Sequence, residues 1–222
     1  MFIPLRSEAS IRHFPFTVIF LIALNIYIFF HLYSQELSPA VKLIQKYSVI
    51  PYEIWHNVDK EPYIPHHVYL TFITSLFLHA GILHILSNML YLWIFGSGVE
   101  DRIGHFRFIF FYLICGVAAS FVHVIFNHES LIPTIGASGA ISGVLGSYLI
   151  IFPKTKIRTF ILFRIFRVPA FVFLSLWIIL QISNVIFKSE GDGNIAWWAH
   201  IGGFLAGFIF IRLYKITPGA RK

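Results

Sequence analysis

Charged residues are scarce in this sequence of 222 residues, and their scarcity argues against a soluble fold. Asp, Glu, Lys and Arg make up 12% of the chain, whereas a soluble domain carries about 25%. So few charges cannot cover the surface of a water-soluble globule of this length. Hydrophobic residues take their place at 57% of the chain, with a mean hydropathy of +0.76. This balance predicts a protein that crosses a lipid bilayer several times.

Cysteine is also nearly absent, which excludes an internal disulfide and a site with several cysteine ligands. The single cysteine, Cys115, lies in an apolar run, where a free thiol behaves as a small hydrophobic group. His79 and His84 are five residues apart, so they diverge on a helix, and no carboxylate is near them in the sequence. We therefore expect neither a bound metal nor another cofactor.

The hydrophobic residues are gathered in long runs. A helix needs about 20 apolar residues to cross the hydrocarbon core, and helices satisfy their own backbone groups within lipid. The sequence therefore predicts an all-α membrane protein, a single domain over residues 1–222 with six transmembrane helices. The predicted spans are 14–32, 79–96, 106–126, 136–153, 168–187 and 195–214.

One connection, residues 33–78, is predicted to be a long loop on the outer side of the membrane. Apolar residues occupy positions 41, 43, 44, 47, 49 and 50 of its segment 41–50, and Tyr52, Trp55 and Tyr63 follow it. Such residues favour the membrane interface. Two interpretations stay open at this point, an element lying in the interface and a partly ordered surface loop.

Basic residues are unevenly distributed between the two sides that six spans define. The side that holds both termini has thirteen Lys and Arg residues and the other side has four, which together make the 17 of the chain. The positive-inside rule places the richer side, and with it the N and C termini, in the cytoplasm. Because these residues lie on short loops at the membrane, the net charge of +7 does not indicate a nucleic-acid partner.

Polar residues inside the predicted spans are the candidates for function, because they are costly in lipid. His84 and Asn88 are four residues apart in the second span and share one helix face. Both are neutral hydrogen-bond donors, as an oxyanion site requires. The alternative is that they only form hydrogen bonds between helices.

The fourth and sixth spans contain a possible nucleophile and base. Ser138 begins the fourth helix, where backbone N–H groups are free of helix partners, and small residues follow it. His200, Gly203 and Gly207 form one stripe of the sixth helix, so close packing of the two helices would bring Ser138 and His200 to the same depth. Histidine is the usual base that activates a serine. The alternative is a small-residue packing helix without catalytic function.

No Asp or Glu lies within a span to orient His200, so the site is predicted to be a Ser–His dyad.

Taken together, the order and spacing of these motifs resemble the rhomboid family of intramembrane serine proteases. The resemblance covers about residues 48–208. The matching positions are His79, His84 and Asn88, then Gly136, Ala137, Ser138 and Gly139, then Ala199, His200, Gly203 and Gly207. Glu100 and Arg102 also resemble the family's Glu-x-Arg segment, which is structural there.

The resemblance implies a role for each matching residue. Ser138 would be the nucleophile and His200 the base, with an oxyanion hole made by His84, Asn88 and the Ser138 backbone N–H. His79, Gly136, Gly139, Gly203 and Gly207 would support the site. The substrate would be a transmembrane segment of another membrane protein, cut near its outer end, and it would enter beside residues 168–195. The expected location is the bacterial plasma membrane.

The sequence departs from the family pattern at two places. The family's long loop carries Trp-Arg shortly before the second span, where this chain has Leu70 and Thr71, and an aromatic residue often stands at the position of Ser142. Neither departure removes a reacting group.

Two other functions remain to be considered. A catalytically inactive rhomboid-like protein could bind transmembrane helices, and a channel or transporter could use the intramembrane histidines. The second would need a charged or broken-helix path, which the spans lack. Substrate and oligomeric state are not specified by the sequence.

Overall fold

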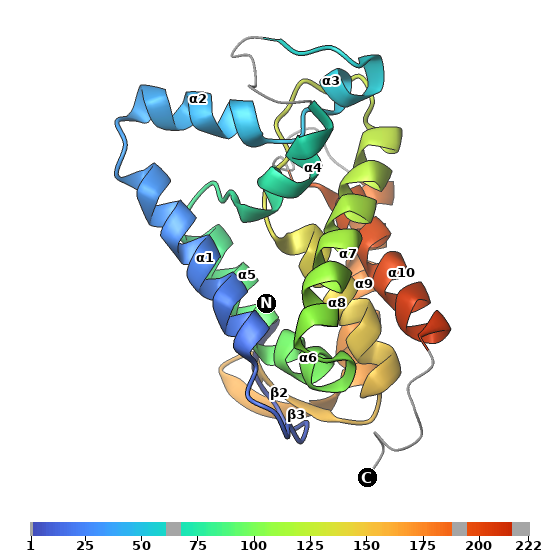
Figure 1. Ribbon diagram of the computed structural model, residues 1–222. Helices are drawn as coiled ribbons and strands as arrows, with labels where there is room; N and C mark the ends of the chain where they lie inside the picture. The colour runs from blue at the N-terminus through green and yellow to red at the C-terminus, as the bar shows by residue number, and fades with distance from the viewer. Residues whose placement is uncertain (1, 61–67, 188–194, 215–222) are drawn as a thin grey trace.

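Apolar helices form a bundle that is capped at one end by a small sheet (Figure 1). The computed structural model describes residues 2–60, 68–187 and 195–214. The helices of the bundle are α1 (Phe16–Tyr33), α5 (Ile82–Tyr91), α6 (Ser97–Ile103), α7 (His105–Phe126), α8 (Ser138–Ile151), α9 (Ala170–Ile186) and α10 (Trp197–Leu213). A π-helical segment, η3 (Leu92–Gly96), joins α5 to α6 without a break.

Each predicted span contains one apolar helix, but the helices differ in length. Among the described residues, three helical runs are long and apolar enough to cross a membrane, and they are Phe16–Tyr33, Ile82–Ile103 and His105–Phe126. The others are shorter, with 14 residues in α8 and 17 each in α9 and α10. The second helix begins at Ile82 and not at His79, and it extends to Ile103.

The long connection between the first two spans is folded and is not a plain loop. It contains α2 (Leu37–Tyr47), α3 (Pro51–His56), η1 (Val68–Leu70), α4 (Thr71–Thr74) and η2 (Ser75–Phe77). Helix α2 has no buried residue and extends away from the bundle at the end opposite the sheet (Figure 1). Tyr63 lies outside the described residues.

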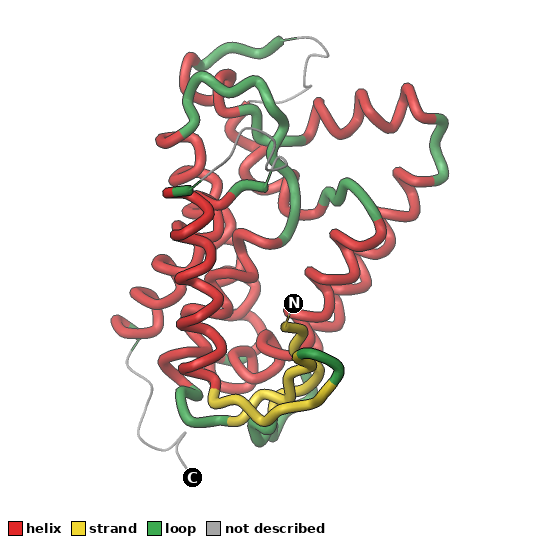
Figure 2. The backbone as a smooth tube through the Cα atoms, turned by 180° about the vertical axis from the view of Figure 1, so that it is seen from behind, coloured by secondary structure: helices red, strands yellow, loops and turns green. Residues whose placement is uncertain are grey.

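The all-α prediction is wrong in one respect, because a three-stranded antiparallel sheet lies at the end of the bundle (Figure 2). Strand β1 (Phe2–Ser7) pairs with β2 (Lys156–Ile161), which pairs with β3 (Arg164–Pro169). These strands were not predicted because basic residues interrupt them and because β1 pairs with a strand that lies far along the chain. Hydrogen bonds from Arg167 and Arg158 to the Glu8 carboxylate tie the strands together and lower the pKa of Glu8.

Helices α8 and α10 pack backbone against backbone. A Cβ atom at Gly203 would clash with the Gly139 carbonyl oxygen, and one at Gly207 would clash with the carbonyl oxygen of Gly143. The Ser147 hydroxyl donates a hydrogen bond to the Gly207 carbonyl oxygen at 2.8 Å. Only glycine permits this approach, so the small-residue stripes set the spacing of the two helices.

Glu100 in α6 caps the start of α1. Its carboxylate accepts hydrogen bonds from the backbone N–H groups of Thr17 at 2.9 Å and Val18 at 2.8 Å, and it contacts His105 Nδ1 at 2.5 Å. Its 1% exposure means that these contacts replace water completely. The neighbouring Arg102 places its guanidinium over the Phe152 ring, 5.0 Å from the centroid.

We expect Gly203→Ala to destabilise the protein by about 2 kcal/mol, because the new methyl group must push α10 away from α8. Thermal unfolding in detergent measures this. Gly81→Ala is the matched control, since a Cβ at Gly81 meets nothing within 4 Å and its backbone is extended. Equal unfolding temperatures for the two variants would contradict the close contact.

We expect Glu100→Ala to lower the free energy of unfolding by about 2 to 4 kcal/mol, because two buried backbone N–H groups lose their acceptor. The control is Glu129→Ala, whose side chain is 67% exposed. Denaturant titration followed by tryptophan fluorescence compares the variants. A loss no larger than that of the control would show that the cap contributes nothing.

Candidate active site

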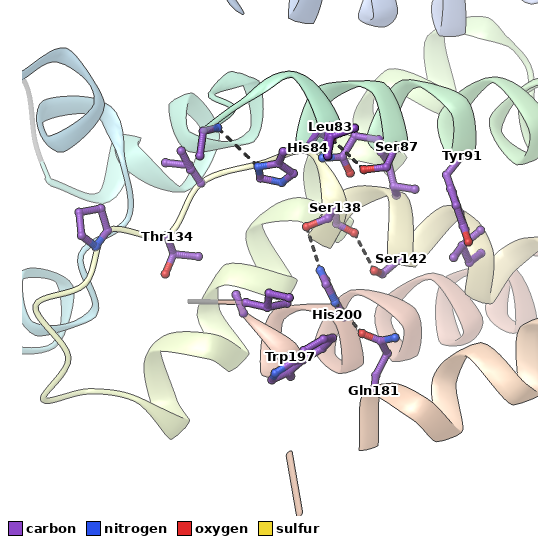
Figure 3. A pocket seen from close by; sticks show the side chains of 18 of the residues that line it. Leu83, His84, Ser87, Tyr91, Thr134, Ser138, Ser142, Gln181, Trp197 and His200 are labelled. Carbon is purple, nitrogen blue, oxygen red and sulfur yellow. Dashed lines mark hydrogen bonds between the residues drawn. The ribbon is translucent and has the colours of Figure 1, made fainter. Parts of the chain in front are cut away.

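Ser138 and His200 face each other across the contact between α8 and α10 (Figure 3). Ser138 Oγ lies 2.9 Å from His200 Nε2, which is hydrogen-bond distance. Ser138 is the first residue of α8, and His200 lies in the first turn of α10. The glycine contacts of Gly139 with Gly203 and of Gly143 with Gly207 therefore hold the two side chains together.

The Gly136 backbone and the His84 ring pack tightly beside the serine. Gly136 has a φ of +121°, which disfavours residues with a side chain. A Cβ at this position would also lie 2.8 Å from His84 Nε2. Gly136 N–H donates to the Ser75 carbonyl oxygen at 2.9 Å, which fixes the turn that leads into α8. Gly136 therefore allows His84 to reach the start of α8.

Two side chains of α5 can donate hydrogen bonds into this space. Asn88 is 6% exposed, and within the described part of the chain its amide nitrogen has no hydrogen-bond partner. His84 Nδ1 lies 3.5 Å from the Ala80 N–H, the outer limit of a hydrogen bond. Because Nδ1 accepts there, the proton of a neutral ring is on Nε2, the atom that lies near Gly136.

A third helix orients His200 through Gln181, a residue that was not among those predicted from the sequence. Gln181 in α9 places its amide oxygen 2.8 Å from His200 Nδ1, while its amide nitrogen donates to the Trp177 carbonyl oxygen at 3.2 Å. An amide oxygen only accepts, so Nδ1 carries the proton and Nε2 accepts from Ser138. The predicted dyad considered only a carboxylate as the partner of His200. The general rule that polar residues inside a span mark function would have indicated Gln181.

Ser142 occupies the position where the family pattern has an aromatic residue, and two tryptophans of other helices lie near His200. The Ser142 hydroxyl donates to the Ser138 carbonyl oxygen at 2.6 Å, one turn back along α8. The rings of Trp177 and Trp197 lie 5.9 and 6.0 Å from the His200 ring. Aromatic contact with the histidine is therefore supplied by α9 and α10.

A cavity of about 820 Å³ surrounds these groups. Its walls come from α2, α5, α8, α9 and α10 and from the residues that lead into α5, α8 and α10. They include Leu83, Ser87, Tyr91, Thr134, Leu145 and Trp197. Four of the predicted site residues line it, namely His84, Asn88, Ser138 and His200. Figure 3 labels His84, Ser138 and His200. The cavity is thus a mainly apolar chamber with the polar groups gathered near Ser138.

The other predicted residues lie outside the cavity wall. His79 is buried behind His84, with ring centroids 5.0 Å apart, and Gly139, Gly203 and Gly207 lie in the helix contact. Glu100 and Arg102 lie in α6, at the end of the bundle that carries the sheet (Figure 1), and they are far from Ser138 in the sequence. At the other departure from the family pattern, the Thr71 hydroxyl is buried and donates to the Val68 carbonyl oxygen at 2.6 Å.

Comparison with known proteins agrees with this arrangement. The model of the rhomboid domain family matches residues 66–215. RHOMBOID-like protein 6, mitochondrial, of Arabidopsis thaliana is 34% identical over 152 residues, which cover 66% of this chain and 45% of that protein. Rhomboid protein 1, mitochondrial, of Saccharomyces cerevisiae is 30% identical over 149 residues, covering 64% and 40%.

A named protease is also among the relatives. Rhomboid protease GluP of Bacillus subtilis is 32% identical over 136 residues, which cover 61% of this chain and 24% of that protein. The chain thus spans less than half the length of each of these three relatives. Because the family model covers more than half of the chain and matches the helices that carry the cavity, the protein belongs to the rhomboid family.

Proposed function

We propose that the protein is a serine endopeptidase that cuts transmembrane segments of other membrane proteins within the bilayer. The observation that carries this proposal is the hydrogen bond of 2.9 Å between Ser138 and His200, near the Asn88 amide nitrogen of α5, which has no partner among the described residues. The name of Rhomboid protease GluP supports the reaction class. No step of the mechanism requires a metal ion or a cofactor.

The hydrogen bonds of the site indicate the order of proton transfers. His200 Nε2 takes the proton of Ser138 as its Oγ attacks the carbonyl carbon of the substrate. The negative charge that forms on the carbonyl oxygen is stabilised by His84 Nε2–H, the Asn88 amide and the Ser138 backbone N–H. His200 then protonates the leaving amine, and a water molecule activated by the same base hydrolyses the acyl-enzyme.

Gln181 has a supporting part in this scheme. By accepting the Nδ1 proton, its amide oxygen keeps His200 in the tautomer whose Nε2 is free to act as a base. A neutral amide stabilises the imidazolium less than a carboxylate does, but it needs no counter-charge within the bilayer.

The substrate is proposed to reach Ser138 between α5 and α9, since both helices line the cavity. The predicted entry segment 168–195 includes α9, while its residues 188–194 lie outside the described part of the chain. A helical substrate must unwind there, because its own hydrogen bonds hide the carbonyl that Ser138 attacks.

The length of α8 supports a site below the membrane surface. Fourteen residues of helix extend about 21 Å, which is less than the ~30 Å of the hydrocarbon core. If α8 reaches the boundary at its sheet end, Ser138 lies beneath the opposite surface, where the cavity can admit water. We propose six spans with both termini in the cytoplasm, because basic residues such as Arg6, Arg158 and Arg212 gather at the sheet end.

Removing either reacting group tests the proposal directly. Ser138→Ala and His200→Ala are each expected to abolish cleavage of a co-expressed membrane-anchored reporter, and Ser138→Ala also to abolish labelling by a fluorophosphonate probe. The matched control is Ser147→Ala, on the same helix but bonded to Gly207. Unchanged cleavage by Ser138→Ala, or an unlabelled native protein that binds transmembrane helices without cutting them, would refute the protease.

Replacing Gln181 tests its positioning role. Gln181→Met keeps the side-chain length but loses the acceptor, so kcat is expected to fall roughly ten-fold, the equivalent of one hydrogen bond, with KM nearly unchanged. Gln181→Glu retains an acceptor oxygen and is expected to recover part of that loss. A fall of equal size in both variants would assign Gln181 a packing role only.

A further inference from the structure

The turn between β2 and β3 presents two large apolar side chains to the outside. Leu162 is 81% exposed and Phe163 is 92% exposed. Both have positive φ values, +45° and +65°, as a tight two-residue hairpin turn requires. Asn and Gly adopt this conformation much more easily than Leu and Phe. The turn therefore retains bulky apolar residues at positions where the backbone favours small or polar ones.

The two strands of the hairpin differ in burial, because β2 is the middle strand of the sheet and β3 is exposed over its first four residues. Ile157 and Thr159 of β2 are fully buried. On β3, Ile165 and Phe166 are 61% and 47% exposed, although Phe166 pairs with the buried Thr159. In both views the hairpin reaches the lateral edge of the molecule at the sheet end (Figures 1 and 2). Nothing in the described part of the chain covers the turn.

The surroundings of the apolar turn are basic. Arg164 directly follows Phe163 and is exposed, and the strands add four exposed basic residues, which are Arg6, Lys156, Arg158 and Arg167. The three strands contain no acidic residue, and Glu8 directly follows the first strand. Its carboxylate is already bonded to Arg158 and Arg167. Apolar side chains beside an excess of positive charge are typical of segments that bind anionic lipid surfaces.

In the proposed six-span topology, the connections of the hairpin put it at the membrane boundary. Helix α8 ends at Ile151, five residues before β2 begins, and β3 continues directly into α9 at Ala170. The Ala170 and Phe171 N–H groups bond to the carbonyl oxygens of Thr155 and Pro153, so the two helix ends meet at the hairpin base. A turn that projects sideways from this point lies at the level of lipid headgroups.

We propose that the β2–β3 hairpin is a membrane-surface anchor that binds anionic phospholipid. Leu162 and Phe163 enter the interface between headgroups and acyl chains, and Arg164 binds the phosphate of a negatively charged lipid in the same leaflet. This anchor is separate from the cavity around Ser138, and it holds the hairpin base, from which α9 starts, at a constant depth.

Spin labelling of the full chain in nanodiscs tests the depth of the turn. In a Cys115→Ala background, a nitroxide on Phe163→Cys is expected to be more accessible to oxygen than to a water-soluble nickel chelate. The same label on Lys156→Cys, at the base of the hairpin on its outward side, is the matched control and is expected to show the reverse. A label at 163 that is as open to the chelate as the control would overturn the proposal.

The lipid specificity has its own test. Replacing part of the phosphatidylcholine by phosphatidylglycerol is expected to raise the ratio of immersed to exposed label at position 163. The expected increase is roughly five-fold, which corresponds to one contact between Arg164 and an anionic lipid. Arg164→Gln is expected to remove that increase without changing the unfolding temperature. Anionic-lipid binding by Arg164 would be refuted if the increase persists in Arg164→Gln, or if immersion does not depend on phosphatidylglycerol. If the turn is immersed only after a second protein is added, the surface binds a protein partner instead.

Discussion

The backbone contact between α8 and α10 is the constraint on which the site depends. Because Gly139 and Gly143 meet Gly203 and Gly207 without side chains between them, the two helices approach more closely than larger residues would allow. Ser138 and His200 lie just beyond this contact, so the helix spacing sets their separation of 2.9 Å. The geometry of the Ser138–His200 pair is therefore a property of the helix packing and needs no long or adaptable side chain.

An apolar bundle allows few polar groups, and those near Ser138 satisfy one another or face the cavity. Ser142 bonds back to the Ser138 carbonyl oxygen, and Gln181 bonds to His200. The Asn88 amide faces the cavity, and its nitrogen has no hydrogen-bond partner among the described residues. A buried donor of this kind is unfavourable until an acceptor arrives. Such a donor is suited to bind an oxyanion, because no protein group among the described residues competes for it.

The sequence predicted the apolar helices and the groups around the cavity because both depend on local patterns. Runs of apolar residues mark the helices, and the stripe of His200, Gly203 and Gly207 marks a packing face. The sheet escaped prediction because its β1–β2 pairing joins residues about 150 positions apart, and strand signals in β2 and β3 are broken by arginines. Gln181 was not predicted because a carboxylate is the usual partner of a catalytic histidine. An amide nevertheless provides the same acceptor atom without a charge.

Helix α9 connects the two ends of the molecule. Its first residue, Ala170, is bonded to the hairpin base, and Gln181 lies eleven residues further, about 16 Å along the helix. Because Gln181 belongs to α9 and His200 to α10, any displacement of α9 at this level lengthens the bond between them unless α10 follows. Helix α10 is held by its glycine contacts with α8 and cannot follow freely. The orientation of His200 therefore depends on the position of α9, the same helix that lines the side of the cavity facing α5.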